Sequence, residues 1–309
     1  MAPQLDVERV ADVVLIASRS TDDDDLLDRE LPAGWANGPV RLLDDLTIER
    51  IEDSDKFMDA CDPAGLDFTS TRQFGQRYSF VRQPAPTRPS VFHCDPDNRI
   101  GTALQLSRYV VLNSHCTEYA ARHLVHYFSE EKLAPLRFEY RFHAYHALRD
   151  GARDWLTDAD ALVLGGLLRT FFRERDRFPK RVLRAMTRCE ESFRTPFTET
   201  AAVGVVTALE SLLKTERRNA GLQFKSRVPA MARELGLTGI TKHRAERFYG
   251  LRSRSVHGAP TLVRAGGGAN LEVRAFETVV TTALRRAIED PSFRRAFKTK
   301  TTVAERWPA

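Results

Sequence analysis

The spacing of hydrophobic residues changes near residue 156. From there to about residue 290, apolar residues recur at intervals of three and four, as on one face of an α-helix. Thr157 and Asp160 lie at the start of this region, and their residue types can form a reciprocal cap at the beginning of a helix. The pattern predicts helices over residues 157–172, 180–193, 198–215, 224–235, 241–257 and 271–288. Consecutive helices with short connections favour an all-α bundle over residues 156–290.

The first 150 residues have a less regular pattern. Residues 74–81 and 137–145 alternate between polar and apolar positions, which predicts β-strands. Residues 100–113 and 117–131 are predicted as helices, and prolines between residues 84 and 89 mark an irregular connection. We therefore predict an α+β fold overall: a mixed α+β module over residues 1–150, the helical bundle, and a C-terminal tail over residues 291–309.

Composition narrows the class of protein. The chain has 309 residues, of which 42% are hydrophobic, which is enough for two domains. No apolar run approaches the roughly 18 residues needed to cross a bilayer, and the first residues do not have the pattern of a secretory signal. Four cysteines in a chain of this length predict free thiols rather than a disulfide framework. We expect a cytoplasmic protein without a membrane partner.

Charge is divided unevenly along the chain. Residues 1–60 contain sixteen acidic and six basic residues, a net charge of −10. Because the whole chain has a net charge of +5, the remaining residues carry +15. Residues 214–257 hold eleven basic and three acidic residues. Such a basic segment favours a polyanionic partner such as RNA, although solvated helix faces would also explain it. The candidate RNA-binding residues in this segment are Arg227, Arg247 and Arg254.

One short motif has the residue types of a catalytic site. Residues 251–258 read Leu-Arg-Ser-Arg-Ser-Val-His-Gly, which places Arg252 five residues before His257. RNA is cut without a metal ion when its 2′-OH attacks the adjacent phosphate. Histidine is the proton acceptor suited to neutral pH, and arginine offers a permanently charged fork for the phosphate. Five residues of ideal helix rotate by about 140°, so the two side chains do not share one face of a straight helix.

This motif resembles the Arg-x4–6-His signature of the HEPN superfamily. Residues 208–213, Ala-Leu-Glu-Ser-Leu-Leu, resemble the helix that opens the core of ApeA-like HEPN domains. The likeness covers residues 156–290. It implies that Arg252 and His257 are catalytic, that Ser253 modulates the site where Asn or Asp is usual, and that Glu210 orients Arg252 or the backbone of the motif. It also implies a homodimer with a composite cleft.

The resemblance implies a metal-independent endoribonuclease that leaves a 2′,3′-cyclic phosphate and acts as a bacterial anti-phage defence or toxin effector. The alternative is a non-catalytic helical module that dimerises or binds RNA or a nucleotide. Phosphate-cradling glycine motifs and nucleophile elbows do not occur, so we predict no cofactor. Six of the eight histidines lie between His93 and His146, but their spacings favour core positions over a zinc site, and no metal ligand is assigned.

Two interpretations also apply to the aromatic and arginine residues that alternate near residue 78. They form a strand with either a solvated face or a platform for stacking unpaired bases. The solvated face is the preferred interpretation.

Overall fold

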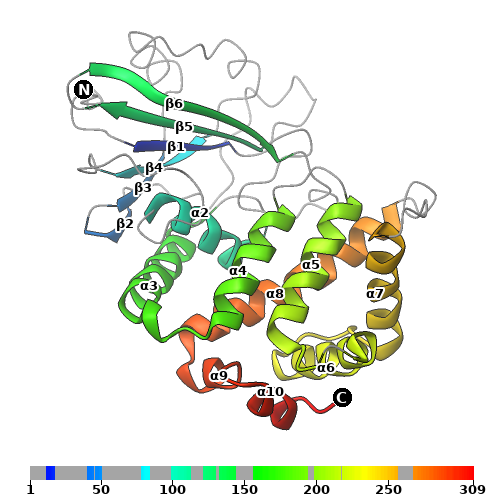
Figure 1. Cartoon of the computed structure of the whole chain (residues 1–309). Helices are drawn as coiled ribbons and strands as arrows, with labels where there is room; N and C mark the ends of the chain where they lie inside the picture. The colour runs from blue at the N-terminus through cyan, green and yellow to red at the C-terminus, as the bar shows by residue number, and fades with distance from the viewer. Residues whose placement is uncertain are drawn as a thin grey trace. The chain divides into compact units, whose positions relative to one another are not determined.

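A computed structural model describes residues 12–17, 40–44, 46–50, 78–83, 99–112, 121–129, 132–143, 156–193, 198–216, 218–256 and 267–309. These residues are mainly helical and include an antiparallel β-sheet (Figure 1). The chain forms two compact units, the first from residues 1–144 and 148–169 and the second from residues 145–147 and 170–309. The division falls inside helix α3, Asp158–Glu174, and not before it as the predicted domain boundary does.

The sheet of the first unit is antiparallel throughout. Its strands are β1 (Asp12–Ala17), β2 (Val40–Leu43), β3 (Leu46–Arg50), β4 (Tyr78–Gln83), β5 (Ala121–Ser129) and β6 (Lys132–His143), in the spatial order β2-β3-β4-β1-β5-β6. Pro135 lies in the edge strand β6, next to an irregularity in its register with β5, and proline within a sheet is confined to such positions because it has no N–H to donate. Both predicted strands are therefore confirmed within the described residues.

One predicted helix is wrong. The sequence pattern predicts a helix over residues 117–131, but Ala121–Ser129 is strand β5, paired with β1 on one side and β6 on the other. A short apolar segment carries little information about its period, and pairing with strands distant in the sequence decides its structure. The helix expected over residues 100–113 is confirmed as α2, Arg99–Val110.

The second unit consists of helices packed around α5. Its helices after α3 are α4 (Lys180–Phe193), α5 (Thr198–Leu213), α6 (Ala220–Glu234), α7 (Lys242–Val256) and α8 (Gly267–Glu289), which confirms the predicted helical spacing. Helix α5 contacts α4, α6, α7 and α8. A methyl group at Gly204 of α5 would lie only 2.6 Å from the Cβ atom of Ser192, so glycine allows α4 and α5 to approach closely.

Helix α3 begins with the predicted reciprocal cap. The hydroxyl of Thr157 accepts a hydrogen bond from the backbone N–H of Asp160 at 3.1 Å, and the Asp160 carboxylate accepts one from the Thr157 N–H at 2.9 Å. Two of the N–H groups that a helix start leaves without partners are satisfied in this way.

Residues 291–309, predicted as a C-terminal tail, contain two helices. They form α9 (Pro291–Arg295) and α10 (Lys300–Arg306), and the buried rings of Phe293, Phe297 and Trp307 pack against one another within this segment. The carboxylate of Asp290 caps α9 by accepting hydrogen bonds from the N–H groups of residues 292 and 293. Asp-Pro at a helix start and apolar residues three to four apart are signals that the sequence contained.

Two ion pairs tie these terminal helices to earlier ones. Arg294 pairs with Glu174 at the end of α3, and its guanidinium carbon lies 4.4 Å from the centre of the Phe178 ring. Arg306 pairs with Glu234 at the end of α6, and the Trp307 indole donates to the same carboxylate at 2.9 Å. The α9–α10 segment is therefore an integral part of the second unit.

In the part of the chain that is described, no helix is both long and apolar enough to cross a membrane.

Candidate functional site

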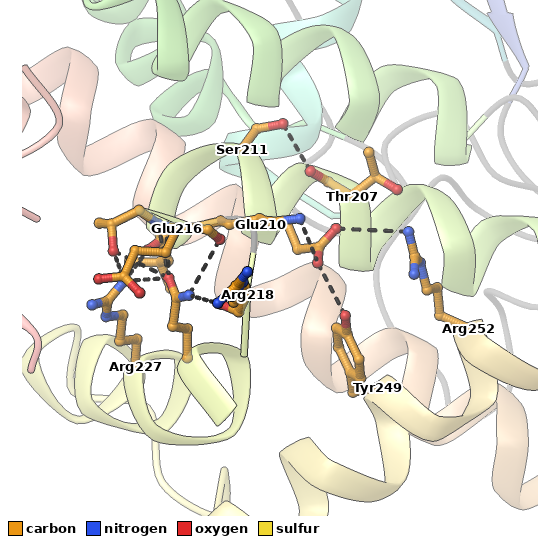
Figure 2. A network of polar contacts seen from close by, with 12 residues as sticks. Thr207, Glu210, Ser211, Glu216, Arg218, Arg227, Tyr249 and Arg252 are labelled. Carbon is orange, nitrogen blue, oxygen red and sulfur yellow. Dashed lines mark hydrogen bonds and ion pairs between the residues drawn. The ribbon is translucent and has the colours of Figure 1, made fainter. Parts of the chain in front are cut away.

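The candidate site is built where α7 packs against α5. Helix α7 presents Tyr249 and Arg252, which are three residues apart and therefore lie on neighbouring turns of one face. Helix α5 presents Glu210 opposite them, and Figure 2 shows both α7 side chains directed toward its carboxylate. Glu210, about forty positions earlier in the sequence, is thus brought to Tyr249 and Arg252 by the packing of two helices.

Glu210 is the centre of this cluster. Its side chain is only 11% exposed, and an Nη atom of Arg252 lies 3.9 Å from Oε2. The hydroxyl of Tyr249 donates a hydrogen bond to Oε1 at 3.2 Å, and the Nζ atom of Lys214 lies 3.9 Å from the same oxygen. The predicted pairing of Glu210 with Arg252 is therefore present (Figure 2). A catalytic role for either residue stays a prediction.

The geometry of Arg252 leaves most of its donors uncommitted. The separation of 3.9 Å from Glu210 is longer than the 2.7–2.9 Å typical of a charge-assisted hydrogen bond. The Nε atom is buried and has no hydrogen-bond partner, while one third of the side chain is exposed. The guanidinium is thus held near a carboxylate and over the edge of the Tyr249 ring, with 5.9 Å from its carbon to the ring centre. It can also donate to an anion that approaches from solvent.

Of the other residues in the predicted motif, Ser253 and Arg254 lie in helix α7 and His257 is not described. Ser253 follows Arg252 in α7 and is half-buried. Arg254 lies in the last turn of the same helix, and its predicted contact with RNA stays a prediction. His257 lies outside the described residues. Helix α7 is regular as far as Val256, so the backbone does not loosen between Arg252 and that residue.

Arg247 is an exposed cation with one partner. Sixty per cent of its side chain is exposed, and one Nη atom lies 3.4 Å from the carboxylate of Glu272 on α8. That carboxylate also accepts hydrogen bonds from Arg244 at 2.9 and 3.0 Å. Arg247 is therefore accessible to a polyanion, in agreement with its predicted role, which no contact in the structure tests.

Arg227 is a correction to the predicted RNA-binding set. Its side chain lies in the interior, where the residue is 4% exposed, and one Nη atom donates to the carbonyl of Leu213 at 2.7 Å, to the hydroxyl of Thr215 at 2.9 Å and to Gln223 Oε1 at 2.8 Å. These contacts close the C-terminal end of α5 (Figure 2). A buried guanidinium that satisfies helix-end carbonyls cannot reach an RNA backbone.

Gln223 completes this second network. Its side-chain amide donates to the carbonyls of Glu216 and Arg218 at 3.3 and 2.9 Å, and its Oε1 atom accepts from the Thr215 N–H at 2.8 Å. The connection between α5 and α6 is thereby fixed to the start of α6. This network holds the C-terminal end of α5 in place, one turn beyond Glu210.

The histidines between residues 93 and 146 form no metal site among the described residues. The sequence pattern places His123 and His126 on one face of a helix, but they lie in strand β5, so that argument does not apply. His143 ends β6, and His93, Cys94, His115, Cys116 and His146 lie outside the described residues. Among the described residues, no group of three or more His, Cys, Asp or Glu side chains is placed to hold a metal ion.

Models of protein families, curated proteins and solved structures were compared with this chain, and none of them matches it. The likeness to the HEPN superfamily therefore rests on residues 208–213 and 251–258 alone. It stays a prediction.

The pairing of Tyr249 with Glu210 makes stability depend on pH. Burial, and then the negative charge of Glu210, raise the pKa of the Tyr249 phenol above its ordinary value of about 10. The folded protein therefore holds this proton more tightly than the unfolded chain. The resulting stabilisation is complete below about pH 10 and is lost as the pH rises through the raised pKa.

We expect Tyr249→Phe to lower the free energy of unfolding by about 1 kcal/mol near neutral pH, because the hydrogen bond to Glu210 is removed. The difference in the free energy of unfolding between wild type and variant should become smaller above about pH 10, because only the wild type has a phenol whose ionisation favours the unfolded chain. Urea unfolding followed by circular dichroism at both pH values measures this. A difference that is the same at both would contradict the prediction.

Proposed function

We propose that this protein is a metal-independent endoribonuclease in which Arg252 holds the scissile phosphate and His257 transfers the proton. The observation that carries the proposal is the placement of Arg252. It stands at a solvent-accessible edge of α7, loosely paired with Glu210, with its Nη groups free to turn toward a phosphate. The HEPN resemblance of the same segment supplies the reaction class.

The reaction needs three roles from the chain. A base removes the proton of the 2′-OH, the 2′-oxygen forms a bond to phosphorus, the bond to the 5′-oxygen breaks, and an acid, such as the imidazolium that has formed, gives the leaving 5′-oxygen a proton. An imidazole near its ordinary pKa suits that proton transfer. Negative charge then builds on the phosphate oxygens, where a guanidinium stabilises it without changing its own protonation. The products are a 2′,3′-cyclic phosphate and a free 5′-hydroxyl.

Glu210 has a positioning role in this proposal. Its carboxylate limits where the guanidinium of Arg252 rests, and the hydrogen bond from Tyr249 fixes the carboxylate in turn. A bidentate ion pair between Glu210 and Arg252 would compete with the phosphate for the N–H groups of the guanidinium. The separation of 3.9 Å keeps the cation oriented and still available.

The proposal places the complete site across a two-fold dimer. Helix α7 is continuous through Val256, and five residues of ideal helix rotate by about 140°, so an ideal helix does not put Arg252 and His257 on one face. An isologous contact between two copies of α7 would instead bring Arg252 of one protomer toward His257 of the other.

Cleavage of total RNA in the presence of EDTA tests the reaction. Wild-type protein is expected to cut, and Arg252→Ala and His257→Ala are each expected to lower the rate by about a hundredfold or more, as loss of a charge-stabilising donor or a general base does elsewhere. A 2′,3′-cyclic phosphate on the products identifies the chemistry. Lys242→Ala, which removes an exposed cation from the first turn of the same helix and has no role in the proposed site, is the control and should retain cleavage.

A mixture of the two inactive variants tests the composite site. If each site takes Arg252 from one protomer and His257 from the other, equal amounts of the variants should regain roughly a quarter of wild-type activity, because half the dimers are mixed and each has one intact site. No recovery would contradict a shared site. Absence of wild-type cleavage under all these conditions would remove the nuclease and favour a module that binds RNA without cutting it.

A further inference from the structure

A groove in the second unit collects positive charge next to the candidate site. It encloses about 570 Å³ and is formed by α4, α5, the residues that follow α5 and the connection between α9 and α10. Two carboxylates, those of Glu210 and Glu216, also line it. The basic residues that line it outnumber them and come from segments far apart in the sequence: Lys180, Arg181, Arg184, Lys214, Lys298 and Lys300.

Among the described residues, four of these cations have no counter-charge. Lys180, Arg184, Lys298 and Lys300 are exposed, and in the described part of the chain none of them lies within ion-pair distance of a carboxylate. Arg188 on the same helix α4 differs, because it pairs with Glu191 at 2.7 Å. Like charges collected in a hollow focus the electric field there and favour entry of an anion.

The effect of this crowding is visible at Arg181. One Nη atom of this residue donates to the carbonyls of Leu212 and Lys214, at 3.4 and 2.8 Å, so the guanidinium is fixed against the end of α5. Burial lowers the pKa of Arg181, and the positive charges of Arg184 and Arg227 lower it further. The groove is therefore an environment in which additional negative charge would be favourable.

The lining determines what kind of anion fits. None of the described side chains that line the groove is aromatic or aliphatic, so a base has no surface on which to stack. The hydroxyls of Thr207 and Ser211 already donate to backbone carbonyls one turn earlier, at 2.7 and 2.8 Å. Ammonium and guanidinium groups remain as the donors, and they recognise phosphate oxygens irrespective of the base.

The groove and the candidate site share one residue. Glu210 lines the groove and is also the partner of Arg252 and Tyr249. Its charge is already offset by Arg252 and Lys214, each at 3.9 Å, which lessens its repulsion of a phosphate. An RNA strand with a phosphate at Arg252 therefore has a second, basic surface immediately beside it.

We propose that this groove binds the backbone phosphates of the RNA strand that is cut at Arg252. The proposal rests on the proposed ribonuclease function and extends it to the α9–α10 segment, which supplies Lys298 and Lys300. It makes binding independent of the base sequence at these positions. It also assigns phosphate contacts to residues outside the basic stretch 214–257.

RNA binding by the full-length protein tests this. The probe is a labelled oligouridylate with 2′-O-methyl groups, which cannot be cut because the attacking hydroxyl is blocked, so binding is measured apart from cleavage. Lys180→Ala/Arg184→Ala and Lys298→Ala/Lys300→Ala are each expected to weaken binding roughly tenfold near physiological salt. The slope of log affinity against log salt should fall by about 0.7 for each phosphate that the variant no longer neutralises.

The control is Arg177→Ala/Arg295→Ala. These two residues are exposed in the same unit, do not line the groove and change the net charge by the same amount. The control should bind RNA like the wild type. Because the two test pairs come from different helices, a local defect at α10 would affect only one of them, whereas loss of the groove affects both.

Each outcome decides the matter. Weaker binding in both test pairs supports the groove, even if wild-type protein cuts no RNA, in which case only the nuclease proposal fails. If both double variants bind RNA as tightly as the wild type while the wild type cuts RNA, the groove proposal is overturned and the nuclease proposal stands. If the pairs bind RNA normally but lose the thermal stabilisation given by inorganic tripolyphosphate, the groove takes a small polyphosphate, and the RNA proposal is overturned.

Discussion

Phe276→Ala is expected to lower the free energy of unfolding by about 4 kcal/mol, close to a thousandfold in the unfolding equilibrium. The Phe276 side chain of α8 is completely buried, and its ring is stacked on that of Phe248 with 4.1 Å between the centres and 2° between the planes. The ring of Phe224 on α6 lies 6.4 Å away. Truncation removes a ring shared by three helices and leaves a cavity that backbone packing cannot close.

Urea unfolding followed by circular dichroism measures this loss. The control is Leu271→Ala on the same helix, where the side chain is 54% exposed and the change should stay within about 0.5 kcal/mol. Phe276→Leu should be intermediate, because much of the apolar volume remains. A loss below about 1 kcal/mol for Phe276→Ala would show that the stack does not hold α6, α7 and α8 together.

The same stack bears on the candidate site. Phe248 immediately precedes Tyr249 and lies one helical turn before Arg252, so the position of this face of α7 depends on what Phe248 packs against. Because protein interiors pack as densely as crystals, removal of a ring changes the packing of its neighbours.

Arg227→Ala is expected to destabilise the protein by about 3 kcal/mol. The guanidinium satisfies the carbonyl of Leu213 at the C-terminal end of α5 together with the side chains of Thr215 and Gln223. Burial lowers the pKa of Arg227, and the charge of Glu216 partly offsets this. Removing the donor takes away the hydrogen bond to the buried carbonyl of Leu213, and an unsatisfied buried acceptor costs more than the hydrogen bond contributes.

Two further variants separate the causes. Arg227→Met keeps most of the side-chain volume but removes the donors, so it should lose nearly as much stability as alanine if hydrogen bonding dominates. Arg233→Ala on the same helix removes an exposed cation and should change the free energy of unfolding by no more than about 0.5 kcal/mol. If instead Arg227→Ala loses RNA affinity without loss of stability, Arg227 contacts RNA after all, and its buried position is not maintained in solution.

The helices after residue 156 were predictable because their signals are local. The reciprocal cap of Thr157 and Asp160 and the apolar spacing within 180–193 depend on residues at most one or two turns apart, so each segment carries its own information. The caps of α9 and α10 are equally local signals. The prediction of a tail for residues 291–309 neglected them.

Strand β5 shows the opposite case. Ala121–Ser129 lies between β1 and β6, and β1 precedes it by more than a hundred residues. A segment this short does not specify a period by itself, so the partners with which it pairs determine whether it is a strand or a helix.

The sequence by itself determined the succession of helices after residue 156. It also contained the two short segments whose family resemblance predicted that Glu210 orients Arg252 or the backbone of the motif, and Glu210 does lie beside Arg252. Only the tertiary structure decided that Arg227 is buried while Arg247 is exposed, and that lysines more than a hundred residues apart meet in one groove. The physical reason is range. Helix period and capping are set within a few residues, whereas burial and the charge of a groove arise from which helix faces pack together.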